Sequence, residues 1–279
     1  MKSKNVAVCL AVIHNNYAPR NRYLFSNLTT LKVYLDKKFR VEEVAISEQP
    51  KIVPHNTAFA FFRRLMLEKL HRDWSRYRKI APPNLLISVY SFIRCYAKQY
   101  LFDNSSVLLW NRKSFIETVL TDKHIRAWSA FIETGCDYLV SFEDDAIFEK
   151  KSKEKLAALI DILFEKYPNQ NVYVDLAGGC DLDPLSLAQL RLFEKDGFVH
   201  YSKPFTNTGC VFIMSRPLVL GFLNEIVRRP DLRLIGADWM INKLFMRLSS
   251  GNFKCTCMHA NPPIFQHGSL TGVYETLIS

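Results

Sequence analysis

Residues 137–148, DYLVSFEDDAIF, put three consecutive acids directly after an apolar run. The apolar part is typical of a buried strand, so Glu143, Asp144 and Asp145 fall at its carboxyl end, where open α/β sheets bind ligands. Adjacent carboxylates repel one another unless a cation lies among them, and oxygen ligands suit Mg²⁺ or Mn²⁺. The stretch therefore predicts a divalent-metal site for a diphosphate substrate. The alternative is a solvated acidic turn that caps the helix starting at Ser152.

Apolar runs and helical periodicities alternate along the chain, which indicates an α/β fold with a mostly parallel sheet covered by helices on both faces. Strands are expected at 5–13, 40–46, 137–142, 171–177 and 210–215, and helices at 20–35, 57–79, 84–102, 121–135, 152–167, 216–227 and 237–248. Thr121 or Asp122 is the expected N-cap of the helix 121–135, and Gly135 is its stop. The segment from His259 onward is expected to be loop-rich.

The 279 residues contain no Gly/Ser- or Pro-rich linker, so we expect one domain over residues 1–279. The formal net charge is +10, and basic residues are concentrated in an expected helical insertion at about 57–110, where aromatic residues are interleaved. Such a segment can lie on an anionic membrane surface, or it is a solvated helix face whose other side packs in the core. No nucleic-acid-binding motif accompanies the charge, so no nucleic-acid partner is expected.

The sequence favours a cytoplasmic location, with peripheral contact to the inner face of the cytoplasmic membrane. No apolar run reaches the roughly 18–20 residues of a membrane span, and the apolar part of the N-terminus is too short for a signal peptide. The seven cysteines are scattered and odd in number, which favours reduced buried thiols over a disulfide framework. Cys255 and Cys257 form a C-x-C pair, for which a redox or metal role is the alternative.

The segment 120–148, LTDKHIRAWSAFIETGCDYLVSFEDDAIF, resembles the central block of glycosyltransferase family 25, the lipopolysaccharide and collagen galactosyltransferase-like group. Further segments that resemble family blocks follow in the family's order, at 20–31, 39–46, 172–179, 206–223, 235–245 and 262–269. The chain departs from the family pattern in HNNYAPRNR after the first strand, in TDKH around the central histidine, and in its longer basic segment.

The resemblance implies a GT-A fold, which is a Rossmann-like domain that holds a nucleotide-sugar and Mn²⁺ or Mg²⁺. UDP-galactose is the donor that the family favours. By analogy Asp145 ligates the metal, while Glu143 and Asp144 hold the ribose, the sugar or a metal-bound water. A further ligand near the C-terminus is often present in such enzymes, and His267 is the candidate. His267 could equally be an ordinary loop histidine, as could His259.

The remaining candidates are assigned by their positions relative to the family blocks. Asn15, just past the first strand, and Arg22, on the first helix, are expected to bind the nucleotide. Their alternatives are turn chemistry for Asn15 and a surface position for Arg22. Asp238 is the expected catalytic base, with N-capping of its helix as the alternative. Asp181 and Asp183 are the runner-up for the base and are also acceptor-binding candidates. His124 is a further acceptor-binding candidate, with a structural hydrogen bond as its alternative.

The function expected is therefore a metal-dependent hexosyltransferase that acts, with inversion and an aspartate base, on a bacterial surface glycan such as lipooligosaccharide or capsule. One alternative is a nucleotidyl- or sugar-phosphate transferase on the same fold, in which the acids would serve attack at phosphorus. Another is a catalytically inactive relative that binds glycans or scaffolds a membrane complex.

Overall fold

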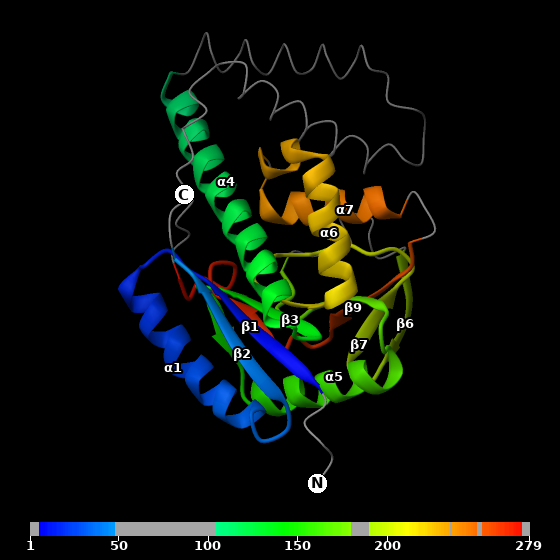
Figure 1. Ribbon diagram of the computed structural model, residues 1–279. Coiled ribbons are helices and arrows are strands. Elements are labelled where there is room, and N and C mark those ends of the chain that lie inside the picture. Colours follow the sequence, from blue (N-terminus) through cyan, green and yellow to red (C-terminus); the bar gives the residue numbers. More distant parts are fainter. Residues whose placement is uncertain (1–5, 48–103, 180–189, 235, 250–252, 275–279) are drawn as a thin grey trace.

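The computed structural model describes residues 6–47, 104–179, 190–234, 236–249 and 253–274 (Figure 1). Its strands are β1 (Ala7–Ile13), β2 (Arg40–Ile46), β3 (Tyr138–Glu143), β4 (Ala146–Phe148), β5 (Asn171–Asp175), β6 (Arg191–Lys195), β7 (Phe198–Tyr201), β8 (Val211–Ser215), β9 (Cys255–Ala260) and β10 (Phe265–His267). Its helices are α1 (Ala18–Leu35), α4 (Asn104–Thr134), α5 (Ser152–Lys166), α6 (Arg216–Arg228), α7 (Ala237–Leu248) and the 3-10 helix η2 (Pro230–Leu234). The expected α/β class is confirmed.

Eight strands form the central sheet, in the order β2-β1-β3-β8-β5-β9-β7-β6. β1 pairs in parallel with both β2 and β3, and β5 pairs in parallel with β9. β8 lies antiparallel between β3 and β5, and β7 lies antiparallel between β9 and β6. The sheet is therefore mixed: only β8 and β7 oppose the direction that the other strands share. The expectation of a mostly parallel sheet holds for the shared direction of these six strands, whereas the strand expected at 210–215 is the antiparallel β8.

The position of β1 within the sheet explains why its sequence is apolar throughout. All seven of its residues are buried, because helices cover both faces of the sheet. Successive side chains of a strand point to opposite faces. Val8, Leu10 and Val12 accordingly belong to one core cluster, and Cys9 and Ile13 belong to the other. The side chains of β1 therefore pack into both hydrophobic cores.

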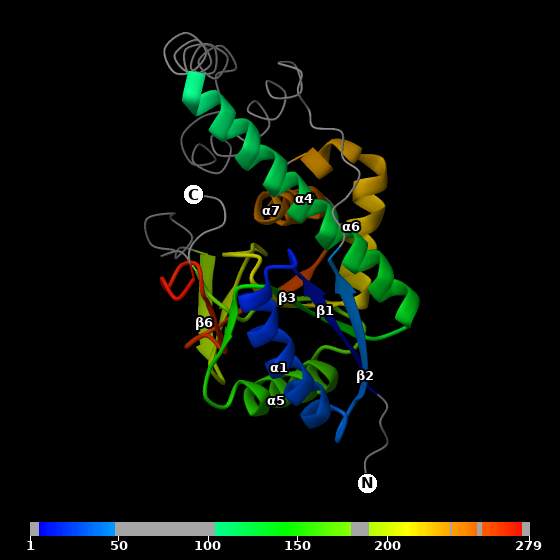
Figure 2. The same ribbon diagram turned by 90° about the vertical axis from the view of Figure 1, so that its left-hand side faces the viewer.

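The helices form two layers on opposite faces of the sheet (Figures 1 and 2). α1 and α5 lie on one face, and α4, α6 and α7 lie on the other. α1 buries Leu24, Leu28, Leu31 and Leu35, whose spacing of three and four residues places them on one side of the helix. This periodicity in the sequence predicted the helix, which begins two residues earlier than expected.

α4 differs most from its expected bounds, because it begins at Asn104 rather than at residue 121. Thr121 and Asp122 therefore lie inside the helix, and neither is its N-cap. Gly135 ends the helix as predicted, with a φ of 71° that favours glycine. The expected helices at 57–79 and 84–102, and with them most of the basic insertion at 57–110, lie outside the described residues.

The closing segment contains two strands that its sequence did not predict. β9 adds to the central sheet, and β10 pairs antiparallel with β4 in a separate two-stranded sheet. In that small sheet His267 lies opposite Ala146, the residue after the acidic triplet. Among the described residues, no helix is both long and apolar enough to cross a membrane.

Candidate active site

The candidate site lies at one edge of the central sheet, where three strand ends meet. Ile13 at the end of β1 is in register with Glu143 at the end of β3. β8 runs the other way, so it begins at this same edge, and the Glu143 N–H donates to the Cys210 carbonyl at 2.8 Å. The topology therefore gathers Asn15, the acidic triplet and Gly209–Cys210, as expected for a ligand site at strand carboxyl ends.

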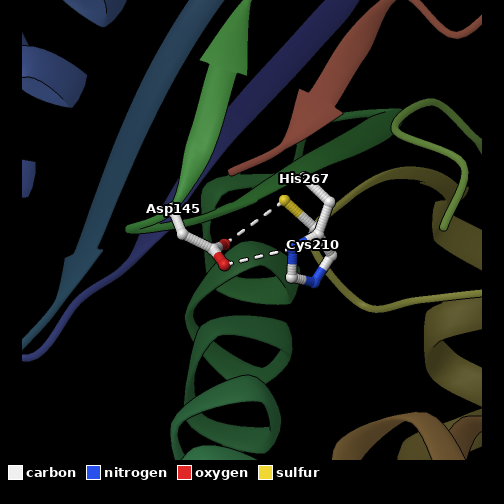
Figure 3. A group of neighbouring side chains, drawn as sticks. All are labelled: Asp145, Cys210 and His267. Carbon is white, nitrogen blue, oxygen red and sulfur yellow. Dashed lines mark hydrogen bonds and ion pairs between the residues drawn. The ribbon is translucent and has the colours of Figure 1, made fainter. Parts of the chain in front are cut away.

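Asp145, Cys210 and His267 form a buried cluster in which one ligand atom of each lies within 4.8 Å of the others (Figure 3). His267 Nδ1 lies 3.2 Å from Asp145 Oδ2. The hydrogen-bond geometry is not met, and this buried nitrogen has no hydrogen-bond partner among the described residues. Ser269 Oγ donates to the same Asp145 oxygen at 2.5 Å. The structure thus brings together the two residues that were expected to ligate a metal.

A divalent cation fits this cluster through Asp145 and His267. A carboxylate oxygen converges there with an imidazole nitrogen that has no hydrogen-bond partner in the described part of the chain, and both are suitable ligands for Mn²⁺. Cys210 plays a different part, since its thiol donates to Asp145 Oδ1 at 3.4 Å. Burial and the neighbouring carboxylates of Asp145 and Glu143 raise the pKa of Cys210 well above its usual range. A metal-binding cysteine must be a thiolate, so Cys210 would join the ligands only if the bound cation displaced this proton.

Asp144 is held by the loop after β1 and by α1. It accepts the Asn15 N–H at 3.2 Å and forms a buried ion pair with Arg20, whose Nη1 is 3.4 Å away. The Arg20 guanidinium also lies 4.9 Å from the ring centre of Tyr274, in a cation–π arrangement. Arg22 is exposed, and residues two apart on a helix face different directions. The arginine that reaches the acids is Arg20.

One carboxylate oxygen of Glu143 is hydrogen-bonded to His124 and is therefore not open to a ligand. The His124 Nε2 lies 2.8 Å from Glu143 Oε1, and the His124 ring has no exposed surface. Burial lowers the pKa of His124 to about 4, so the ring is neutral, and its Nδ1 has no partner among the described residues. The donor in this hydrogen bond depends on the His124 tautomer and on whether the Glu143 carboxyl, whose pKa burial raises to about 8, carries its proton. The covered His124 ring supports Glu143, and its expected role in acceptor binding stays a prediction.

Asp238 lies in the first turn of α7 and does not cap it. The N-cap is Gly236, and no side-chain hydrogen bond caps this helix, so the capping alternative was wrong. A Cβ added to Gly209 would lie 2.8 Å from Asp238 Oδ1 and 3.1 Å from Glu143 Oε1. Asp238 and Glu143 therefore approach the same point of the Gly209 backbone. Burial raises the pKa of Asp238 to about 7, and that of Glu143 to about 8.

Asp175 is a site residue that the sequence did not single out. It has no exposed surface, and it accepts the N–H groups of Gly178 at 3.0 Å and Asn207 at 3.1 Å. These hydrogen bonds hold the loop that places Gly209 between the carboxylates of Asp238 and Glu143. The signal was present in the sequence, since Asp175 ends an apolar strand just as Glu143 does.

Lys123 was also missed, and it is buried without any exposed surface. Its Nζ donates to the His14 carbonyl and to Asn15 Oδ1, both at 2.7 Å. Burial lowers the pKa of Lys123, and the nearby Asp144 carboxylate opposes that shift. Asn15 is exposed at the end of β1, where the nucleotide was expected.

Asp181 and Asp183, expected to bind the acceptor, lie outside the described residues. His259 is buried at the end of β9, and its Nε2 lies 3.2 Å from the Phe205 carbonyl. It belongs to the support of the Gly209 loop rather than to the Asp145 cluster. Comparison with protein-family models gives no match, and comparison with curated protein sequences gives none either.

Proposed function

We propose that this protein is a metal-dependent glycosyltransferase of the GT-A type, which transfers a hexose from a nucleotide-sugar to a glycan acceptor. The observation that carries the proposal is the approach of His267 Nδ1 to Asp145 Oδ2 at 3.2 Å, without a hydrogen bond, at the carboxyl end of β3. The resemblance to glycosyltransferase family 25 supports the same reading, and it favours UDP-galactose as the donor.

Asp145 and His267 would hold the divalent cation in this proposal. When bound, the cation would neutralise the negative charge that develops on the departing nucleoside diphosphate. Asp144 stays close to Asn15 and Arg20, so it keeps the loop after β1 in place beside that site. The hydrogen bond between His124 Nε2 and Glu143 Oε1 fixes the direction in which the other Glu143 oxygen faces.

Asp238 is assigned as the base that takes the proton of the acceptor hydroxyl. A base works best when its pKa is near the working pH, and burial raises the pKa of Asp238 to about 7. The Gly209 N–H donates to this carboxylate and orients it. Glu143, on the other side of Gly209, discourages ionisation of Asp238 through the repulsion of like charges.

The acceptor class follows from the resemblance and from the charge of the chain. We propose a bacterial surface glycan, such as lipooligosaccharide or capsule, or its lipid-linked precursor. The net charge of +10 suits peripheral contact with an anionic membrane, where such precursors are attached.

A donor screen that follows nucleotide release in the presence of Mn²⁺ tests the proposal. We expect metal-dependent turnover of a nucleotide-sugar, which Asp145→Asn abolishes. Asp161→Asn is the matched control, because Asp161 is a surface residue paired with Lys38. Turnover of nucleoside triphosphates instead would indicate a nucleotidyltransferase. Absence of any nucleotide binding would indicate an inactive relative.

A further inference from the structure

Lys123 holds the side chain of Asn15 in one orientation. An ammonium group only donates hydrogen bonds, so the atom of Asn15 that lies 2.7 Å from Lys123 Nζ must be the amide oxygen. The Asn15 N–H is held as well, by Asp144 at 3.2 Å. Asn15 is therefore fixed at both its backbone and its side chain.

This arrangement gives the exposed end of Asn15 a defined polarity. Because its oxygen faces the buried Lys123, its NH₂ group is the part that is left to face the ligand side. No described residue accepts from that group, and Asn15 is exposed. The amide therefore offers its two N–H donors to a molecule bound at the end of β1, while its oxygen is turned towards Lys123.

We propose that Lys123 is a positioning residue that makes Asn15 a selective donor to a carbonyl oxygen of the nucleotide base. The inference rests on the proposed function, because it takes a nucleotide as the ligand. A neutral carbonyl suits the position better than a phosphate, since the charges beside Asn15 are already matched: Asp144 pairs with Arg20, and the Lys123 ammonium donates to His14 and Asn15. Uracil presents a carbonyl oxygen where cytosine presents an amino group. Asn15 would accordingly favour uracil.

The test compares the binding of UDP, CDP and inorganic pyrophosphate to the whole chain, each with Mn²⁺, by isothermal titration. Asn15→Asp keeps an oxygen for Lys123 but replaces the donors with a second acceptor. We expect the wild type to prefer UDP, and Asn15→Asp to weaken UDP about tenfold or more while it weakens CDP less. Pyrophosphate affinity should change no more than in Asn16→Asp, which places the same charge one residue further along.

Lys123→Met provides a second, independent readout. Without the ammonium, the Asn15 amide can turn over, so the ratio of UDP to CDP affinity should fall towards one. A purely structural role for Lys123 would weaken both nucleotides in parallel and leave that ratio unchanged. Thermal unfolding of each variant shows that the fold is retained before titration.

Three results would overturn the inference. The first is an unchanged ratio of UDP to CDP affinity in both Asn15→Asp and Lys123→Met. The second is a loss of pyrophosphate affinity in Asn15→Asp that matches its loss of UDP affinity, which would assign Asn15 to a phosphate. The third is an equal effect of Asn16→Asp, which would indicate charge repulsion alone. If the wild type binds no nucleotide with Mn²⁺, the proposed function itself fails, and this outcome is distinct from the other three.

Discussion

His267 Nδ1 lies 3.2 Å from Asp145 Oδ2, although the two residues are far apart in the sequence. The short pairing of β10 with β4 produces this approach, because it sets His267 opposite Ala146. The Gly268 N–H then donates to the Asp145 carbonyl at 2.9 Å and closes the arrangement. The backbone pairing of β10 with β4 thus fixes the distance between a carboxylate and an imidazole, which together suit a divalent transition metal such as Mn²⁺.

Metal binding should raise the thermal stability of the protein through these two residues. We expect Mn²⁺ to increase Tm in the wild type, since a ligand that binds only the folded state stabilises it. Asp145→Asn and His267→Gln should each weaken the response, with Mn²⁺ affinity reduced about tenfold or more. Cys210→Ser should keep the response, because the Cys210 thiol donates to Asp145 Oδ1 and is not one of the two assigned ligands. A response to Zn²⁺ alone that depends on Cys210 would contradict the assignment.

The rate of transfer should depend on the ionisation of Asp238. A base must be deprotonated to act, and the pKa of Asp238 is raised to about 7, chiefly by burial. We therefore expect kcat/KM to rise with pH up to about 7 and then to level off. Asp238→Asn should lower the rate by about 10²- to 10⁴-fold and remove this rise. A profile of the same shape in the variant would exclude Asp238 as the base.

Asp238 should also make stability depend on pH, in the opposite sense from an ordinary ion-paired carboxylate. Its folded pKa of about 7 lies above the ordinary value of 3.8, so between these two values the folded state holds more protons than the unfolded state. The stability that Asp238 contributes is complete below pH 4 and is lost as pH rises through 7. Compared with Asp238→Asn in EDTA, the wild-type Tm should fall between pH 5 and pH 8. A constant difference in Tm would contradict this.

Gly209 should not tolerate a side chain, because a Cβ there would lie 2.8 Å from Asp238 Oδ1 and 3.1 Å from Glu143 Oε1. We expect Gly209→Ala to displace one carboxylate, to reduce activity, and to destabilise the fold by about 1–3 kcal/mol. Gly221→Ala is the matched control. Gly221 lies inside α6, and a Cβ there would be 3.6 Å from the Leu248 side chain, which is an ordinary contact distance. Helix propensity should make that control more stable by up to about 1 kcal/mol. Urea unfolding and turnover measure both.

The sequence predicted five of the eight central strands, because their apolar runs are continuous and end in charged or turn residues, and it missed β6, β7 and β9. β3 with its acids is the clearest case, and Asn15 after β1 followed from the same rule. The antiparallel direction of β8 could not be read in this way, since a buried strand is apolar whichever way it runs. β10 is only three residues long, which leaves no periodicity to detect. The resemblance to a family, rather than the local pattern, pointed to His267.

The site residues that the sequence did not predict are placed there by tertiary contacts. Lys123 lies in a helix, where a lysine normally faces solvent, and only the His14 carbonyl and Asn15 of a distant loop account for its burial. Arg20 and Arg22 have the same chemistry, and the phase of α1 against the sheet determines which of them meets Asp144. Neither contact can be recognised from the local sequence pattern.

Calorimetric titration of UDP into the protein, with Mn²⁺ and again with EDTA, tests the central claim most directly. We expect UDP to bind with Mn²⁺, to lose most of its affinity in EDTA, and to bind Asp145→Asn equally weakly under both conditions. The account would be contradicted if UDP bound with the same affinity in EDTA as in Mn²⁺, or if Asp145→Asn retained the metal dependence of the wild type.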